Sequence, residues 1–279
     1  MTYSPPLAPS GSVLGNIPVV DMRDWVDGDE RVRAHFIQVV GDALREYGFL
    51  RLRGHSVMPS LIEPAYAAAR AFFSLSEDDK SDYFVAGGGG ERGYTPFGSE
   101  HAKDMPTPDL KEFWHTGREL SSLHPLHTVY PPNLWPVEVP EFKARMLDLY
   151  NALEAVAMDM LEVIARYLGE APDSLSSIAR DGNSILRALH YPPLHNVSVV
   201  EGAVRAAAHE DINLITVLPA STRPGLQILT RDGEWLPVTT PPDVMICDTG
   251  DMMQLITGGR LPATTHRVVN PEGADGGRH

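Results

Sequence analysis

The sequence predicts a mainly β protein with a double-stranded β-helix (jelly-roll) core, an N-terminal α/β region and flanking helices. The first half of the chain contains long stretches with apolar residues at helical spacing, whereas residues 183–279 contain short β-rich runs separated by turn signals. Short strands at even intervals favour a jelly roll or a barrel. With 279 residues, of which 43% are hydrophobic, the chain can bury a large interior.

The N-terminal region is expected to alternate strands and helices. Residues 1–16 are rich in Pro, Ser and Gly and predict a loose arm. Short strands are expected at 17–21 and 49–52. Helices are expected at about 29–47, where apolar residues recur at helical spacing before Gly48, and at 59–73, with a capped helix start at 76–80. We assign residues 17–120 to this region.

The middle of the chain connects the two halves. The run Gly87–Gly90 predicts a mobile loop that could act as a lid, and it lacks the lysine of a phosphate-binding loop. Residues 121–140 are rich in Pro and His, and we expect His124 and His127 to face solvent. A packing helix is predicted over 141–168. We assign residues 121–182 to this connection.

After residue 182 the pattern changes to short strands and turns. The turn signals include Pro192-Pro193, Asp232-Gly233 and Gly258-Gly259. The expected strands are residues 184–190, 197–200, 213–218, 225–229, 234–237, 243–247, 252–256 and 265–269.

The charge balance and the single cysteine limit the classes of function. The chain has 23 basic and 37 acidic residues, a formal charge of −14. So acidic a surface repels phosphate backbones and anionic lipid, which makes nucleic acids and membranes poor partners.

Cys247 has no intramolecular disulfide partner. No apolar run reaches the roughly 18 residues of a membrane span, and the N-terminus lacks a secretory pattern, so we expect a cytoplasmic protein. Its oligomeric state stays open.

His209, Asp211 and His266 are the candidate metal ligands and catalytic residues. On an extended strand, residues at i and i+2 share a face, so His209 and Asp211 could reach one ion while Glu210 points away. Two imidazoles and one carboxylate hold one face of a mononuclear non-haem Fe(II) ion and leave the other face open for O₂ and a co-substrate. An HxD pair alone is common, so the distant His266 on a second strand decides this interpretation.

The succession of motifs along the chain resembles the isopenicillin N synthase-like family of Fe(II)- and 2-oxoglutarate-dependent dioxygenases. The resemblance covers nearly the whole chain. Its N-terminal pieces are Ile17-Pro18-Val19-Val20-Asp21, Gly48-Phe49-Leu50 with Gly54-His55, and Phe72-Phe73 with Lys80. Its C-terminal pieces are Leu186-Arg187 with Tyr191-Pro192, His209-Glu210-Asp211, Gly225-Leu226-Gln227, Gly250-Asp251, Thr257-Gly258-Gly259 and His266-Arg267-Val268.

This resemblance implies the cofactors and their contacts. Fe(II) would bind His209, Asp211 and His266, and 2-oxoglutarate would be held at its far carboxylate by Tyr191 and Arg278. With O₂, such an enzyme oxidises a small molecule, usually by hydroxylation, and releases succinate and CO₂. The family's Arg-x-Ser begins at Arg278, so we expect its Ser and the C-terminal segment of the core (183–279) to lie beyond His279.

Two other functions remain open on the sequence alone. Some proteins of this fold are Fe(II) oxidases or cyclases that use no 2-oxoglutarate, and a jelly roll can also be a non-catalytic binding protein. The substrate is not identified by the sequence. Four aromatic residues could line its pocket, although a packing role is favoured for each: Tyr94 after Gly93, Phe97, Phe113 and Trp114.

Overall fold

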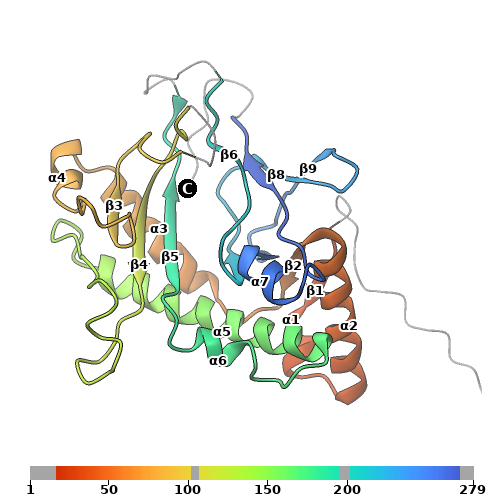
Figure 1. Cartoon of the computed structure of the whole chain (residues 1–279). Coiled ribbons are helices and arrows are strands. Elements are labelled where there is room, and N and C mark those ends of the chain that lie inside the picture. Colours follow the sequence, from red (N-terminus) through yellow and green to blue (C-terminus); the bar gives the residue numbers. More distant parts are fainter. Residues whose placement is uncertain (1–16, 102–106, 195–201, 271–279) are drawn as a thin grey trace, which may run out of the picture.

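The computed structural model describes residues 17–101, 107–194 and 202–270. Within them the strands form three open sheets, and helices pack below and beside these sheets (Figure 1). The pairs are antiparallel, except that β1 and β2 run parallel. The sheet-rich C-terminal half agrees with the sequence prediction. The closed jelly roll stays a prediction, because the described sheets do not close.

The first sheet joins strands from both ends of the chain, in the order β1-β2-β10-β7. Its strands are β1 (Val19–Asp21), β2 (Phe49–Arg53), β10 (Met245–Thr249) and β7 (Ile215–Leu218). In the second sheet, β6 (Ala206–His209), β11 (His266–Val268), β8 (Leu226–Leu229) and β9 (Trp235–Pro237) lie in that order. The third sheet has the order β3 (Gly93–Thr95), β4 (Glu112–Gly117) and β5 (Ile185–His190).

The helices begin and end where local chemistry favours it. Asp29 caps the second helix by accepting from the Val32 N–H at 2.9 Å, and Gly48 ends it in the left-handed region at φ 64°. Ser76 caps the fourth helix through the N–H of Asp79. The helices are α1 (Met22–Val26), α2 (Glu30–Tyr47), α3 (Pro59–Phe73), α4 (Glu77–Ser81), α5 (Phe142–Leu168), α6 (Ser176–Ala179) and α7 (Asp251–Ile256).

Two buried clusters hold these elements together. The helix-side core lies where α2, α3 and α5 meet the sheets, and its aromatic centre is Phe72, whose ring lies 4.7 Å from that of Trp114 and 5.7 Å from that of Phe142. The sheet-side core surrounds β6, β8 and β11 and includes Phe49 and Tyr191. Each large apolar side chain so buried contributes about 1.5–3 kcal/mol.

The structure corrects several elements. The expected strand at 252–256 is wrong, because these residues belong to α7. The Asp251 and Met252 N–H groups donate to the Asp211 and Asn213 carbonyls, which seats the first turn of that helix. A short apolar run cannot distinguish a strand from a buried helix by period alone. The sequence prediction also missed α1, α6, β3 and β4, and the expected strand 197–200 lies outside the described residues.

Within the described ranges, no helix has both the length and the hydrophobicity needed to cross a membrane. The longest helix, α5, has one buried apolar face, and acidic and basic residues occupy positions between the buried ones.

Candidate metal centre

His209, Asp211 and His266 meet at the edge of the second sheet. β11 pairs with β6 so that His266 lies opposite His209, and the two ring centroids are 4.4 Å apart. Asp211 lies just beyond the end of β6 rather than on the strand, which corrects the expectation that one strand carries both ligands. Its Oδ1 lies 3.9 Å from His209 Nε2 and 3.7 Å from His266 Nε2.

The two imidazoles are oriented by backbone carbonyls. The Nδ1–H of His209 donates to the Ala207 carbonyl at 2.7 Å, and the Nδ1–H of His266 donates to the Thr264 carbonyl at 3.2 Å. With Nδ1 so engaged, the Nε2 atom of each ring is the one that faces Asp211. Burial, with the adjacent His209, lowers the pKa of His266, which favours the neutral ring that a metal requires.

A hydroxyl orients the carboxylate of Asp211. Thr216 Oγ1 donates to Asp211 Oδ2, and Asn213 Nδ2 donates to Thr216 Oγ1 at 2.9 Å. This arrangement leaves Oδ1 facing the imidazoles. Glu210 accepts from Thr265 and lies outside the cluster, in agreement with its exclusion as a ligand.

A second acid lies buried near this carboxylate. Burial first, and the charge of Asp211 second, raise the pKa of Asp248 on β10 well above its ordinary value.

The donor set fits a ferrous ion. The candidate ligand atoms of the triad all lie within 4.8 Å of one another, each on a half-buried residue. Metal bonds to imidazole nitrogen and carboxylate oxygen are about 2.1 Å long, so the three atoms need to move inward by only roughly half an ångström. Nitrogen and oxygen donors without thiolate suit iron in this triad pattern.

Of the two residues expected to hold 2-oxoglutarate, Tyr191 is described and Arg278 lies outside the described residues. Tyr191 is buried in the sheet-side core with Ala206 of β6. The guanidinium of Arg205, also buried, lies 5.6 Å from the Tyr191 ring centroid. Tyr191 therefore lies alongside the strand that ends at His209.

The aromatic residues considered for the substrate pocket divide between the two faces of the third sheet. Tyr94 and Trp114 are buried in the helix-side core, which supports the packing role expected for them over a role in the pocket. The Tyr94 hydroxyl donates to the buried carboxylate of Glu112 at 2.5 Å, and burial raises the Tyr94 pKa far above its ordinary value. Phe113 lies on the opposite face of β4, in register with Leu189.

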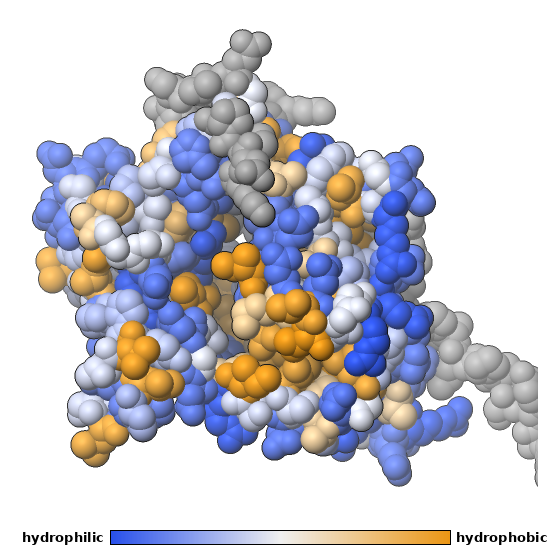
Figure 2. All heavy atoms as spheres, in the orientation of Figure 1, coloured by the Kyte–Doolittle hydropathy of each residue, from blue (hydrophilic) through white to orange (hydrophobic). Residues whose placement is uncertain are grey.

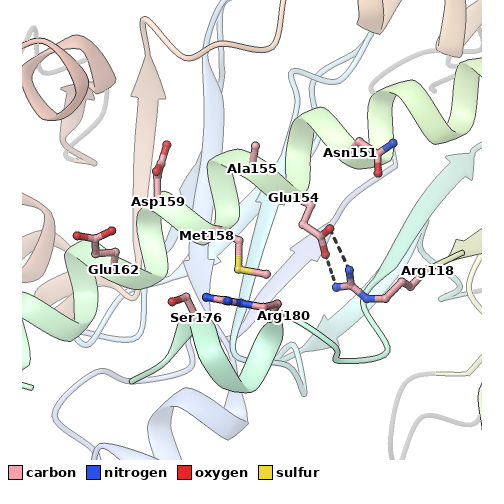
Figure 3. Close-up of a pocket in the computed structure, with 9 residues that line it drawn as sticks. All are labelled: Arg118, Asn151, Glu154, Ala155, Met158, Asp159, Glu162, Ser176 and Arg180. Carbon is pink, nitrogen blue, oxygen red and sulfur yellow. Dashed lines mark hydrogen bonds and ion pairs between the residues drawn. The ribbon is translucent and has the colours of Figure 1, made fainter. Parts of the chain in front are cut away.

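A separate pocket of about 470 Å³ lies along α5 and α6 (Figure 3). Arg118 lines one side of it and forms a two-armed ion pair with Glu154. The remaining lining residues are Asn151, Ala155, Met158, Asp159, Glu162, Ser176 and Arg180. This pocket shares no residue with the histidine–aspartate cluster and contains no histidine or cysteine, so we place the chemistry at the cluster.

Sequence reasoning missed several polar residues beside the cluster. Thr216 stands five positions after Asp211, and nothing in its local sequence marks it as a carboxylate partner. Asp109 accepts from the Ala207 N–H at 2.9 Å and so anchors β6 from another part of the chain. Arg187 could have been found from the sequence. It stands two residues before Leu189 and four before Tyr191, and alternate residues of a strand share a face, so its side chain is expected on the same side as theirs.

Comparisons with known proteins agree with this geometry. Residues 17–138 match the family described as non-haem dioxygenase in morphine synthesis N-terminal, and residues 182–278 match the 2OG-Fe(II) oxygenase superfamily. The 2-oxoglutarate-dependent dioxygenase citB of Monascus ruber is 30% identical over 266 residues, which cover 91% of this chain and 80% of that protein. A 2-oxoglutarate-Fe(II) type oxidoreductase of Aspergillus fumigatus is 29% identical, with coverage of 92% and 79%.

Solved structures give the same result. A 2OG-Fe(II) oxygenase family protein from Caulobacter crescentus has a TM-score of 0.81 and 40% identity, with 92% of this chain and 81% of that chain covered. A full-length Neurospora crassa protein in complex with alpha-KG has a TM-score of 0.82 and 26% identity, with 94% and 82% covered. Together with the His-Asp-His cluster, these matches show that the chain belongs to the 2OG-Fe(II) oxygenase family, as a non-haem Fe(II), 2-oxoglutarate-dependent dioxygenase that uses O₂.

Proposed function

We propose that His209, Asp211 and His266 bind Fe(II), and that the enzyme hydroxylates a C–H bond of a small organic molecule while 2-oxoglutarate is converted to succinate and CO₂. The observation that carries this proposal is the convergence of the three donor atoms within 4.8 Å. The bound iron supplies the oxygen-activating redox chemistry. The protein's part is to orient the ligands, and the two carbonyl contacts to Nδ1 atoms do this for the imidazoles.

Tyr191 and Arg278 are our candidates for the far carboxylate of 2-oxoglutarate. The burial of Tyr191 beside β6 supports its part of this assignment. An arginine fork matches a carboxylate with two parallel hydrogen bonds. A small-molecule substrate is supported by relatives, since further structures of the Neurospora crassa protein contain alpha-KG with thymine or 5-formyluracil.

We further infer that the second sheet and strands β7 and β10 belong to a jelly roll over residues 183–279. In this division residues 17–120 form the N-terminal region and 121–182 the connection. The pairing of β2 with β10 supports a close association of the two ends. A reducing compartment such as the cytoplasm would keep the iron ferrous.

Anaerobic spectroscopy tests the proposal. Fe(II) and 2-oxoglutarate together should produce a weak visible charge-transfer band, and admission of air with substrate should release one succinate per O₂ consumed. His266→Ala should lose both signals while keeping a cooperative unfolding transition. His127→Ala, in an exposed loop, serves as the matched control. Oxygen uptake without succinate would instead identify an oxidase that needs no 2-oxoglutarate.

A further inference from the structure

β5 presents two different faces to the molecule. Leu186 and Ala188 pack against the helix-side core, whereas Leu189 and Tyr191 pack against or within the sheet-side core. Because alternate residues of a strand share a face, Arg187 points to the same side as Leu189 and Tyr191. This side faces the sheet that contains β6 and β11, seen across from β5 in Figure 1. Arg187 is therefore a cation on the wall opposite the candidate metal centre.

The guanidinium of Arg187 is held in place by its neighbours on β4. Its Nε–H donates to His115 Nε2 at 2.6 Å, and the His115 Nδ1–H donates to the Gly90 carbonyl. Burial, with the nearby Arg187 charge, lowers the pKa of His115 to about 3, so the ring is neutral and can accept. The Phe113 ring lies 4.6 Å from the guanidinium carbon. The side chain still keeps 39% of its surface exposed, which leaves its terminal N–H groups accessible.

A carboxylate stands next to this guanidinium. Glu100 Oε1 lies 3.6 Å from Arg187 Nη2, and Lys111 Nζ contacts Glu100 at 2.6 Å and Asp109 at 2.8 Å. Asp109 in turn accepts from the Ala207 N–H of β6, the strand that ends at the candidate metal site. Burial alone would raise the pKa of Glu100, but the charges of Arg187 and Lys111 outweigh it and lower that pKa. Glu100 is therefore an ionised acceptor.

The charges in this chain of contacts balance. Glu100 and Asp109 are matched by Lys111 and Arg187, and His115 is neutral. Arg187 would attract an anionic ligand and Glu100 would repel it. A cationic ligand would be attracted by Glu100 and repelled by Arg187. A neutral group that accepts from Arg187 and donates to Glu100 satisfies both, and the 3.6 Å spacing allows the two contacts to adjacent atoms of one ligand.

The rim of the site is apolar. Ile212, directly after Asp211, is 78% exposed, and Met252, Leu255 and Ile256 of α7 are also exposed. Figure 2 shows apolar side chains gathered at α7 beside a hollow in the surface. Since α7 is joined to the segment after Asp211 by backbone hydrogen bonds, this apolar rim adjoins the metal centre.

We infer that Arg187 and Glu100 recognise the substrate, and that they select neutral, largely apolar compounds with a carbonyl beside an N–H, such as lactams, imides and ureides. The carbonyl accepts from Arg187, the N–H donates to Glu100, and the apolar remainder lies against the rim. This inference rests on the proposed function, because it names the substrate class of the same site.

A matched ligand panel tests the inference. The probes are phthalimide, 2-piperidone and 5,5-dimethylhydantoin, their N-methylated counterparts, and benzoate as an anion. Binding to the Fe(II)- and 2-oxoglutarate-loaded protein is measured anaerobically by calorimetry. We expect wild-type protein to bind at least one N–H compound about tenfold more tightly than its N-methylated partner, because the partly buried carboxylate of Glu100 then loses its donor. Benzoate should bind more weakly than that compound.

Two substitutions separate the recognition groups. Arg187→Met should weaken binding of the preferred compound about tenfold, with partial recovery in Arg187→Lys, because a charged donor is lost and then partly restored. Glu100→Gln should remove most of the discrimination against N-methylation and improve benzoate binding. Arg180→Met, in the pocket along α5 and α6, is the control and should bind like wild type.

The outcomes distinguish this inference from the proposed function. Equal or weaker binding of every N–H compound relative to its N-methylated partner overturns the substrate class, as does a preference for benzoate. If Arg187→Met does not fold, Glu100→Gln alone decides, since unchanged discrimination in that variant refutes the role of Glu100. Absence of the charge-transfer band in wild-type protein would instead refute the oxygenase assignment of the cluster, whatever the ligand preference.

Discussion

Replacing Thr216 with valine should weaken metal binding without touching a metal ligand. The Thr216 hydroxyl donates to Asp211 Oδ2, and this contact leaves Oδ1 facing the Nε2 atoms of His209 and His266 at 3.9 and 3.7 Å. Valine has nearly the same shape but no donor, so the carboxylate is free to rotate away. A hydrogen bond to a charged group contributes about 1.5–3 kcal/mol. The Asp211 side chain is partly exposed, so we take the lower end of this range, which corresponds to a loss of about tenfold in affinity.

The measurement is an anaerobic titration of the protein with Fe(II) at saturating 2-oxoglutarate, followed by the visible band. Thr216→Ser keeps the hydroxyl and should bind the metal within about threefold of wild type. Thr128→Val, in an exposed loop, controls for the substitution itself. Unfolding of each variant is measured without metal, so that a loss of folding is not mistaken for a loss of affinity. If Thr216→Val binds Fe(II) as tightly as wild type, the hydroxyl does not position Asp211 and the reasoning is refuted.

Three further outcomes are expected. Arg278→Ala should raise the 2-oxoglutarate concentration needed for half-maximal turnover at least about tenfold, since a bidentate charged contact is lost; an unchanged requirement in steady-state kinetics excludes that role. His115 has a folded pKa of about 3, below its ordinary 6.5, so its stabilisation is complete above pH 6.5 and is lost as pH falls toward 3. Urea unfolding should therefore show wild type losing about 2 kcal/mol relative to His115→Gln between pH 6.5 and 5, and parallel pH profiles would contradict this. Lys80→Met removes the buried ammonium partner of Glu112, whose side chain is 4% exposed and pairs with Lys80 at 2.8 Å, and leaves it the contacts from Tyr94 and His190. We expect a loss of about 1.5–3 kcal/mol in unfolding free energy, and a loss below about 1 kcal/mol argues against a stabilising pair.

The first sheet explains why the two halves of the chain act together. β10, from the C-terminal half, lies between β2 and β7 and pairs with both. β10 also leads through Gly250 into α7, whose first turn donates to carbonyls of the segment after Asp211. The N-terminal strands thereby support the geometry of the metal centre although they contribute no ligand to it.

Local features of the chain could be predicted because their causes are local. Asp29 and Gly48 delimit α2, and the apolar period of α5 predicted its span within one residue. The choice of His209, Asp211 and His266 followed from residue type and from resemblance, and the structure brings these three together.

Contacts between distant segments were decided by the tertiary structure. Residues 252–256 form a helix because the segment after Asp211 offers carbonyls to its first N–H groups, a partner no local pattern contains. Arg187 meets His115 only because β4 pairs with β5 in one register, and a shift of one residue would turn Arg187 to the helix side. The amino-acid types alone therefore determined which chemistry the chain can support, whereas strand register and packing determined which of these side chains come together.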